Sequence, residues 1–180
     1  MINVINSALA ALTVFGQALL VAGLIYLFLS RGRKDENFRR VLGSYFPVLG
    51  LAVVLAATAG SLYYSEIAGY NPCKLCWYQR IFMYPLVPIF GLALFKKDRR
   101  TADYVLALAA IGALISLYHN YIYYFGSAAN ACSAVGPDES CVRRFIVAFG
   151  YVSIPLEALT AFALIIALAL AGQRYRPDGK

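Results

Sequence analysis

Two cysteines separated by two residues stand in the stretch NPCKLCWYQR, which runs from Asn71 to Arg80. Such a pair supports three kinds of chemistry: a small structural disulfide, half of a zinc site, or a dithiol that cycles through thiol–disulfide exchange. A static bridge closing so small a loop contributes little stability, and short strained bridges are the most readily reduced. Attachment of c-type haem needs a histidine where this chain has Trp77. The pattern therefore favours redox chemistry, with zinc and a static bridge as alternatives.

The residues around this pair predict a helix that begins at the cysteines. Asn71 is the expected N-cap and Pro72 the expected first helical residue. Cys73 and Cys76 would then lie in the first turn, where the helix dipole favours the thiolate, the form that attacks and leaves. Arg80 lies four residues after Cys76, so it is expected on the same face, where its charge would stabilise that thiolate.

Cys132 and Cys141 form a second pair, in the polar segment ANACSAVGPDESCVRR. A disulfide that staples this loop is the simplest interpretation. Their spacing is loose for a zinc knuckle. A second pair on the same face of a membrane would also allow electrons to pass between the pairs by thiol–disulfide exchange. In that case the exposed pair would meet a protein partner, and the pair at the lipid boundary a lipid-soluble oxidant.

The elements that position these cysteines are predicted to be membrane-spanning helices. Of the 180 residues, 61% are hydrophobic and 14% charged, and the mean hydropathy is +0.66, far above a soluble domain. A span needs about 20 apolar residues, and lipid offers the backbone no hydrogen-bond partners, so each span is expected to be a helix. Five stretches qualify, at about residues 4–29, 41–64, 77–95, 104–125 and 153–171.

Several local features refine this prediction. Pro85 and Pro88 are expected to kink the third span, whereas Pro47 and Pro155 are expected near helix starts. An amphipathic stripe over residues 142–149 predicts a short helix on the membrane surface, because two arginines beside it would be costly in lipid.

Basic residues flank the spans, which is the pattern that anchors cytoplasmic loops. The net charge of +7 therefore does not indicate nucleic-acid binding, which needs a folded basic surface. The pattern places residues 31–40, 96–100 and the tail from 173 in the cytoplasm. The N-terminus and all four cysteines then face outward, the oxidising side of a bacterial-type plasma membrane. No positive charge precedes the first span, so it is expected to be a retained helix and not a signal peptide.

Two ionisable residues fall inside predicted spans. His119, in LYHNYIYY, has two open interpretations: a hydrogen bond to a neighbouring helix, or a role beside a quinone or in a proton pathway. Glu157 raises the same question, and a solvated position in the membrane interface is the favoured one.

The stretches PCKLCWYQR and YVSIPLEALTAF resemble the DsbB/BdbC family of disulfide-formation membrane proteins, over roughly residues 41–171. The resemblance implies a four-helix bundle that passes electrons from a DsbA/BdbD-like thioredoxin-fold thiol oxidase to a membrane quinone, either ubiquinone or menaquinone. It implies that the partner's thiolate attacks Cys132, that Cys141 exchanges with Cys73, and that Cys76 delivers the electrons. Arg80 matches the family's arginine that supports quinone reactivity, and His119 roughly matches a histidine near the quinone.

The predicted fold is an all-α, polytopic membrane helical bundle with a four-helix core and one extra N-terminal transmembrane helix. Residues 1–40 hold the extra helix and a cytoplasmic loop, 41–172 the redox bundle, and 173–180 a cytoplasmic tail. The expected function is that of a membrane enzyme, a thiol:quinone oxidoreductase without a resident metal. The alternatives are a relative of vitamin K epoxide reductase, whose Cys-x-x-Cys tends to follow the loop pair, and a non-catalytic membrane protein held together by its cysteines or by a metal.

Overall fold

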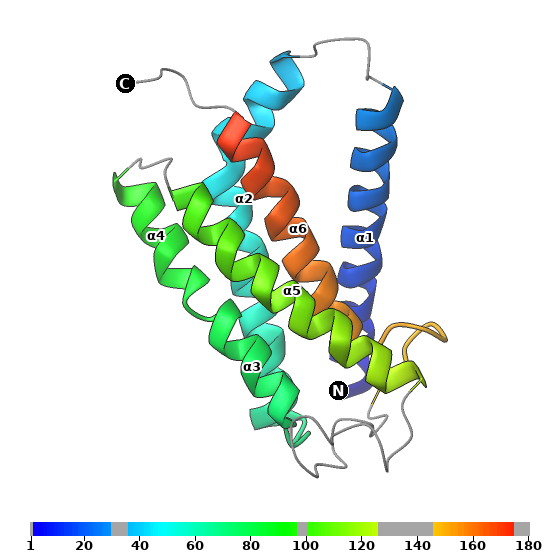
Figure 1. The fold of residues 1–180 in the computed structure, drawn as a ribbon. Helices are drawn as coiled ribbons and strands as arrows, with labels where there is room; N and C mark the ends of the chain where they lie inside the picture. Colours follow the sequence, from blue (N-terminus) through cyan, green and yellow to red (C-terminus); the bar gives the residue numbers. More distant parts are fainter. Residues whose placement is uncertain (1, 30–35, 97–100, 126–145, 175–180) are drawn as a thin grey trace.

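The protein is a bundle of long helices that run between two ends of the molecule (Figure 1). The computed structural model describes residues 2–29, 36–96, 101–125 and 146–174. Within these ranges, five helical segments are long and apolar enough to cross a membrane, which confirms the predicted polytopic helical bundle. The helices are α1 (Ile2–Leu29), α2 (Glu36–Leu62), α3 (Lys74–Met83), α4 (Leu86–Lys96), α5 (Thr101–Phe125) and α6 (Ile154–Arg174), with a π-helical turn, η1 (Tyr63–Ile67), continuing α2.

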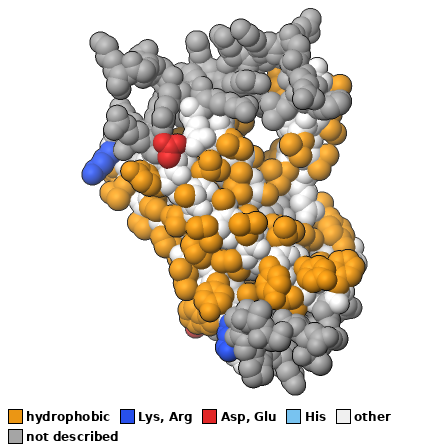
Figure 2. Space-filling model, viewed as in Figure 1, with side chains coloured by type: hydrophobic (Ala, Val, Ile, Leu, Met, Phe, Trp, Pro, Cys, Tyr) orange, Lys and Arg blue, Asp and Glu red, His pale blue; other side chains and the backbone are white. Residues whose placement is uncertain are grey.

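The outer surface of the bundle is apolar. Figure 2 shows hydrophobic side chains over most of the described surface between the two ends, and charged side chains only near those ends. Leu114, Leu117 and Tyr104 of α5 are among the large side chains that face outward. An apolar surface of this size would be unfavourable in water, but lipid tails solvate it. A membrane protein can therefore have apolar residues both on its surface and in its core.

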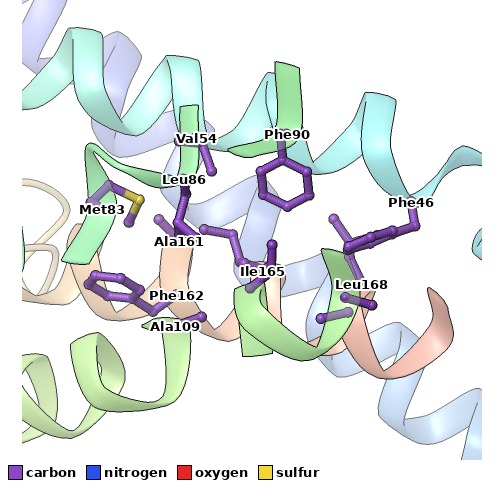
Figure 3. Close-up of a cluster of buried hydrophobic side chains, with 13 residues drawn as sticks. Phe46, Val54, Met83, Leu86, Phe90, Ala109, Ala161, Phe162, Ile165 and Leu168 are labelled. Atoms are coloured by element: carbon purple, nitrogen blue, oxygen red, sulfur yellow. The ribbon is translucent and has the colours of Figure 1, made fainter. Parts of the chain in front are cut away.

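The buried core lies between α2, α4, α5 and α6 (Figure 3). The rings of Phe46 on α2 and Phe90 on α4 pack edge to face, with centroids 5.4 Å apart. Phe162 and Ile165 of α6 are fully buried in the same cluster. The most extensive helix contacts are those of α6 with α5 and with α2, so α6 is the central helix. The helix α1 packs mainly on α6 and lies outside this core, as the predicted extra helix should.

Close packing of α5 on α6 depends on the absence of a side chain at Gly112. A Cβ atom there would overlap Cε1 and Cζ of Phe162, which has no room to move because it is fully buried. We therefore expect Gly112→Ala to lower the free energy of unfolding by about 1–3 kcal/mol, the usual cost of overpacking a core. Thermal denaturation in one detergent would measure it. Gly91→Ala on α4 is the control, because a Cβ there meets nothing within 4 Å, and equal melting temperatures for the two variants would contradict the prediction.

The prolines of the third and fifth spans fit the predictions, whereas Pro47 does not. The chain breaks between α3 and α4 at Tyr84–Pro85, and Pro155 is the second residue of α6. Pro88 lies in the first turn of α4, just after this break. The expectation for Pro47 is wrong, because α2 begins at Glu36 and Pro47 lies well inside it. Hydropathy marks where apolar residues begin, whereas this helix already starts among the polar residues that precede them.

The prediction of a surface helix over residues 142–149 is wrong for residues 146–149, the part that the structure describes. Residues 142–145 lie outside the described residues, and the described part forms a tight turn closed by an antiparallel bridge between Ala148 and Val152. Phe149 has φ 51° and Gly150 φ 80°, values that no α-helix contains. The hydroxyl of Tyr123 on α5 donates to the Ile146 carbonyl at 3.2 Å, so contacts with α5 hold this segment in a conformation that its periodicity does not reveal.

Candidate functional site

The first cysteine pair lies at the start of α3, with Cys73 as the N-cap. Its backbone is extended (φ −72°, ψ 171°), and its Sγ accepts a hydrogen bond from the Cys76 N–H at 3.4 Å. The expectation that Asn71 caps the helix and Pro72 begins it is wrong by two residues, although Cys76 does lie in the first turn. A sulfur thus takes the place that a serine or aspartate oxygen usually fills. The N–H donor and the helix dipole both favour negative charge on Cys73.

The two sulfurs are adjacent and differ in their access to the surroundings. The Sγ atoms of Cys73 and Cys76 lie 3.1 Å apart. Cys73 is 1% exposed, whereas Cys76 is only partly buried. The pair is therefore close enough to form a disulfide by side-chain rotation, and Cys76 is the member that a small molecule reaches more easily.

His119 of α5 contacts the more buried sulfur. Its Nε2 lies 3.7 Å from Cys73 Sγ, and its Nδ1 lies 3.1 Å from the amide Nε2 of Gln79. Both ring nitrogens of His119 therefore have a polar neighbour, the Cys73 sulfur at Nε2 and the Gln79 amide at Nδ1. His119 and Gln79 are both buried, which keeps water from competing for these bonds. The arrangement allows a proton to pass between Cys73 and His119.

Gln79 is a site residue that sequence reasoning did not identify. It stands in NPCKLCWYQR, but an amide side chain does not itself indicate redox chemistry. Its spacing of three residues from Cys76 would have placed it on the same helix face.

Arg80 is a buried cation held against α2. Its Nε donates to the Ser61 hydroxyl and its Nη2 to the Ser61 carbonyl, both at 2.9 Å, and its guanidinium lies 5.1 Å from the centre of the Trp77 ring. The Tyr84 hydroxyl also donates to Ser61 Oγ, at 3.3 Å. The sequence led us to expect this charge beside Cys76, but two of its donors instead point at Ser61. A cation this deep in a membrane span is expensive and marks a functional site.

Glu157 of α6 also faces inward, not into the solvated interface that the sequence favoured. Both of its carboxylate oxygens accept from the Tyr64 hydroxyl, at 3.2 and 3.0 Å. Tyr64 lies in η1, where Ala68 N donates to Tyr63 O at 2.9 Å across the wider π-helical turn. Such turns are frequent at functional sites because the extra residue redirects the side chains.

Most of these side chains line one large cavity of about 1320 Å³. Its wall near the start of α3 carries polar and sulfur groups, whereas the remainder is mostly apolar. The residues that carry the polar and sulfur groups are Cys73, Cys76, Gln79, Arg80, His119, Tyr64 and Glu157. Small-molecule sites combine an apolar lining with a few convergent polar groups. The donor set fits a quinone, whose ring carries two carbonyl acceptors and whose tail is apolar: Arg80 and Gln79 offer N–H donors, and the aliphatic walls match the tail.

The same cysteines and histidine could hold a metal ion. The ligand atoms of Cys73, Cys76 and His119 lie within 4.8 Å of one another, and this is the one cluster of this kind within the described ranges. Zinc sites take three protein ligands and a water, or four protein ligands. The geometry is thus compatible with two chemistries, thiol exchange and metal binding.

The second pair, Cys132 and Cys141, lies outside the described residues. How these cysteines meet Cys73 therefore stays a prediction. The described chain on either side, the end of α5 and the start of α6, lies at the same end of the bundle as the start of α3 (Figure 1).

Comparison with known proteins matches most of the chain to one family. The profile described as "Disulfide bond formation protein DsbB" matches residues 44–172. "Disulfide bond formation protein C" of Bacillus subtilis (strain 168) is 49% identical over 117 residues, which are 63% of this chain and 82% of that protein. "Probable disulfide formation protein C" of Halalkalibacterium halodurans is 43% identical over 141 residues, 77% of this chain and 94% of that protein. No solved structure matches the chain significantly.

Proposed function

This chain belongs to the DsbB family of disulfide bond formation proteins, and from that premise we propose that it is a thiol:quinone oxidoreductase that reoxidises a thioredoxin-fold disulfide donor outside the membrane. The family makes it a disulfide-forming oxidoreductase, and its five apolar helices fit a multi-pass membrane protein. The observation that carries the finer proposal is the pair of Cys73 and Cys76, which opens, beside Arg80 and His119, onto a long apolar cavity.

The proposed exchange moves two electrons and two protons from the donor to the first cysteine pair. In the oxidised chain both pairs are disulfides. The donor's thiolate attacks Cys132 and breaks the loop disulfide, which releases the Cys141 thiolate. This thiolate attacks Cys73 of the disulfide between Cys73 and Cys76, which frees Cys76. The donor's second thiol then expels Cys132, so the donor leaves as a disulfide. Cys132 finally re-forms its bond to Cys141 and releases Cys73. The net result is an oxidised donor, an intact loop disulfide, and the dithiol of Cys73 and Cys76.

A quinone held in the cavity would accept two electrons and two protons, and the disulfide between Cys73 and Cys76 would be restored. The chain's own groups prepare this transfer. The Cys76 N–H and the start of α3 favour negative charge on the Cys73 sulfur, and His119 holds or accepts its proton. Arg80 keeps a positive charge at the polar end of the cavity, which would attract a quinone carbonyl oxygen as it gains charge. The aliphatic walls exclude water.

We further propose that the cysteine end of the bundle faces outward from a bacterial plasma membrane. The beginning of α1, the beginning of α3 and the end of α5 share that end, whereas the end of α6 lies at the other (Figure 1). Basic residues that flank the spans at the opposite end support a cytoplasmic location for it.

The test is a reconstitution of the full chain in lipid nanodiscs with a chemically reduced thioredoxin-fold oxidase and a quinone. Quinone absorbance and donor thiols are followed together, and we expect one donor disulfide for each quinol. Without quinone, donor oxidation should stop after at most two donor molecules per chain, because the two cysteine pairs hold only two disulfides. Continued donor oxidation without quinone would contradict the quinone acceptor, and an absence of donor oxidation would contradict the whole proposal.

A metal-binding function is the second candidate, supported by the cluster of Cys73, Cys76 and His119. Elemental analysis of the same preparation separates the two. Zinc retained at one ion per chain, together with no thiol–quinone turnover, would favour a metal site. Turnover by zinc-free protein would exclude a required metal.

A further inference from the structure

The extra helix α1 forms one wall of the cavity that reaches the cysteines. It is fastened to the bundle at a few polar points. The amide of Gln17 donates to Thr160 Oγ1 at 3.2 Å and accepts from the Tyr151 hydroxyl at 3.0 Å, and the Tyr63 hydroxyl donates to the Ile2 carbonyl at 3.3 Å. All these contacts lie in the first two thirds of α1, yet the helix continues to line the cavity as far as Tyr26.

The cavity is long enough to cross most of a bilayer's hydrocarbon layer. Its lining on α2 runs from Ser61 to Leu42, and nineteen steps at 1.5 Å per residue make about 28 Å, against roughly 30 Å for the hydrocarbon core. Its volume of about 1320 Å³ exceeds the range of roughly 300–1,000 Å³ typical of sites for compact ligands. A compact ring would occupy only the end near Arg80.

Small residues on the facing helices create this space. The lining includes Gly23 on α1 and several alanines on α2 and α6. A Cβ atom on Gly23 would meet nothing within 4 Å, so α1 leaves open space at this position. Beyond the polar end, aliphatic side chains dominate the wall, so only an apolar chain would be solvated there.

We propose that α1 closes a chamber for the polyprenyl tail of a membrane quinone, with the ring at the cysteine end. The proposal rests on the quinone acceptor proposed above and adds where its tail lies and which helix holds it. The continuity between the redox groups and the aliphatic trough selects this occupant over a phospholipid, because one molecule then fills both ends.

The first test compares Gly23→Phe, which fills the chamber, with Val21→Phe, which places the same aromatic side chain on the outward face of α1. Two quinones with the same ring are used, one with a single isoprene unit and one with a long tail. For Gly23→Phe we expect the Michaelis constant of the long-tailed quinone to rise roughly tenfold, and that of the short-tailed quinone to stay within about twofold. Val21→Phe should change neither. Equal constants for the two variants with the long tail would overturn the proposal.

The second test does not depend on turnover or on a variant that folds. A long-tailed quinone with a photoreactive diazirine at the far end of its tail is bound to the unmodified chain and illuminated, and labelled peptides are identified by mass spectrometry. Labelling of residues 16–26 of α1 is expected. Labelling confined to other helices, or a phospholipid that the quinone does not displace, would overturn the proposal. If the tail proposal fails in this way but the same preparation still reduces the short-tailed quinone, the proposed function stands. If the preparation reduces neither quinone, the proposed function fails as well.

Discussion

Cys76→Ser is expected to stop steady-state quinone reduction, with turnover falling at least about a hundredfold, because a serine hydroxyl neither forms a disulfide with Cys73 nor donates electrons. Cys76 is the more accessible sulfur of the pair and lines the cavity, so the proposed path to the quinone has no substitute for it. The measurement is quinone absorbance under steady turnover with a reduced thioredoxin-fold donor. The donor should still form a mixed disulfide with the variant, because the loop cysteines are unchanged.

The control for this variant is Tyr78→Phe, which changes an exposed residue on the same turn of α3 and removes only a hydroxyl. It should turn over quinone at the wild-type rate. Both variants should melt at the wild-type temperature, which separates lost chemistry from lost structure. Quinone reduction that persists in Cys76→Ser at more than a few per cent of the wild-type rate would refute the assignment of Cys76, whatever the donor does.

The spans were predictable from the sequence because the bilayer imposes one dominant constraint. Backbone groups in lipid must bond within the segment, so a long apolar stretch such as that of α5 has one available conformation. The helix boundaries were less predictable, since α2 begins among charged residues at Glu36 and the segment after Ile146 forms a turn against α5. Those outcomes depend on tertiary contacts that periodicity does not contain.

The type of chemistry at the site was predictable from the sequence, whereas the contacts between its side chains were not. Spacing predicted that Cys73 and Cys76 share a helix start, because the first turn places residues three apart on one face. Spacing did not predict that Arg80 would bond to Ser61, nineteen residues earlier, or that Gln79 would hold His119 against Cys73. These contacts cross between helices, and one chain's local pattern cannot specify which helices meet.

Arg80→Ala should lower quinone turnover by about a hundredfold, the usual effect of removing one preorganised donor from a site where charge develops. Arg80→Lys keeps the charge, but its single ammonium cannot reproduce the paired bonds from Nε and Nη2 to Ser61, so we expect a smaller loss of about tenfold. The measurements are the turnover number and Michaelis constant for quinone. Lys74→Ala is the control, because it removes an exposed cation from the same helix and should leave both constants near their wild-type values.

Variants of Ser61 test whether quinone turnover depends on the position of the Arg80 guanidinium as well as on its charge. Ser61→Ala removes the hydroxyl acceptor of Nε and leaves the carbonyl acceptor of Nη2, so its effect should be smaller than that of Arg80→Lys. If Ser61 acts by holding the guanidinium, the double variant Ser61→Ala, Arg80→Lys should lose less than the product of the two single losses, because the second change removes a bond that is already gone. Independent, multiplicative losses would mean that Ser61 does not act through Arg80. Wild-type kinetics in Arg80→Ala would remove the arginine from the mechanism altogether.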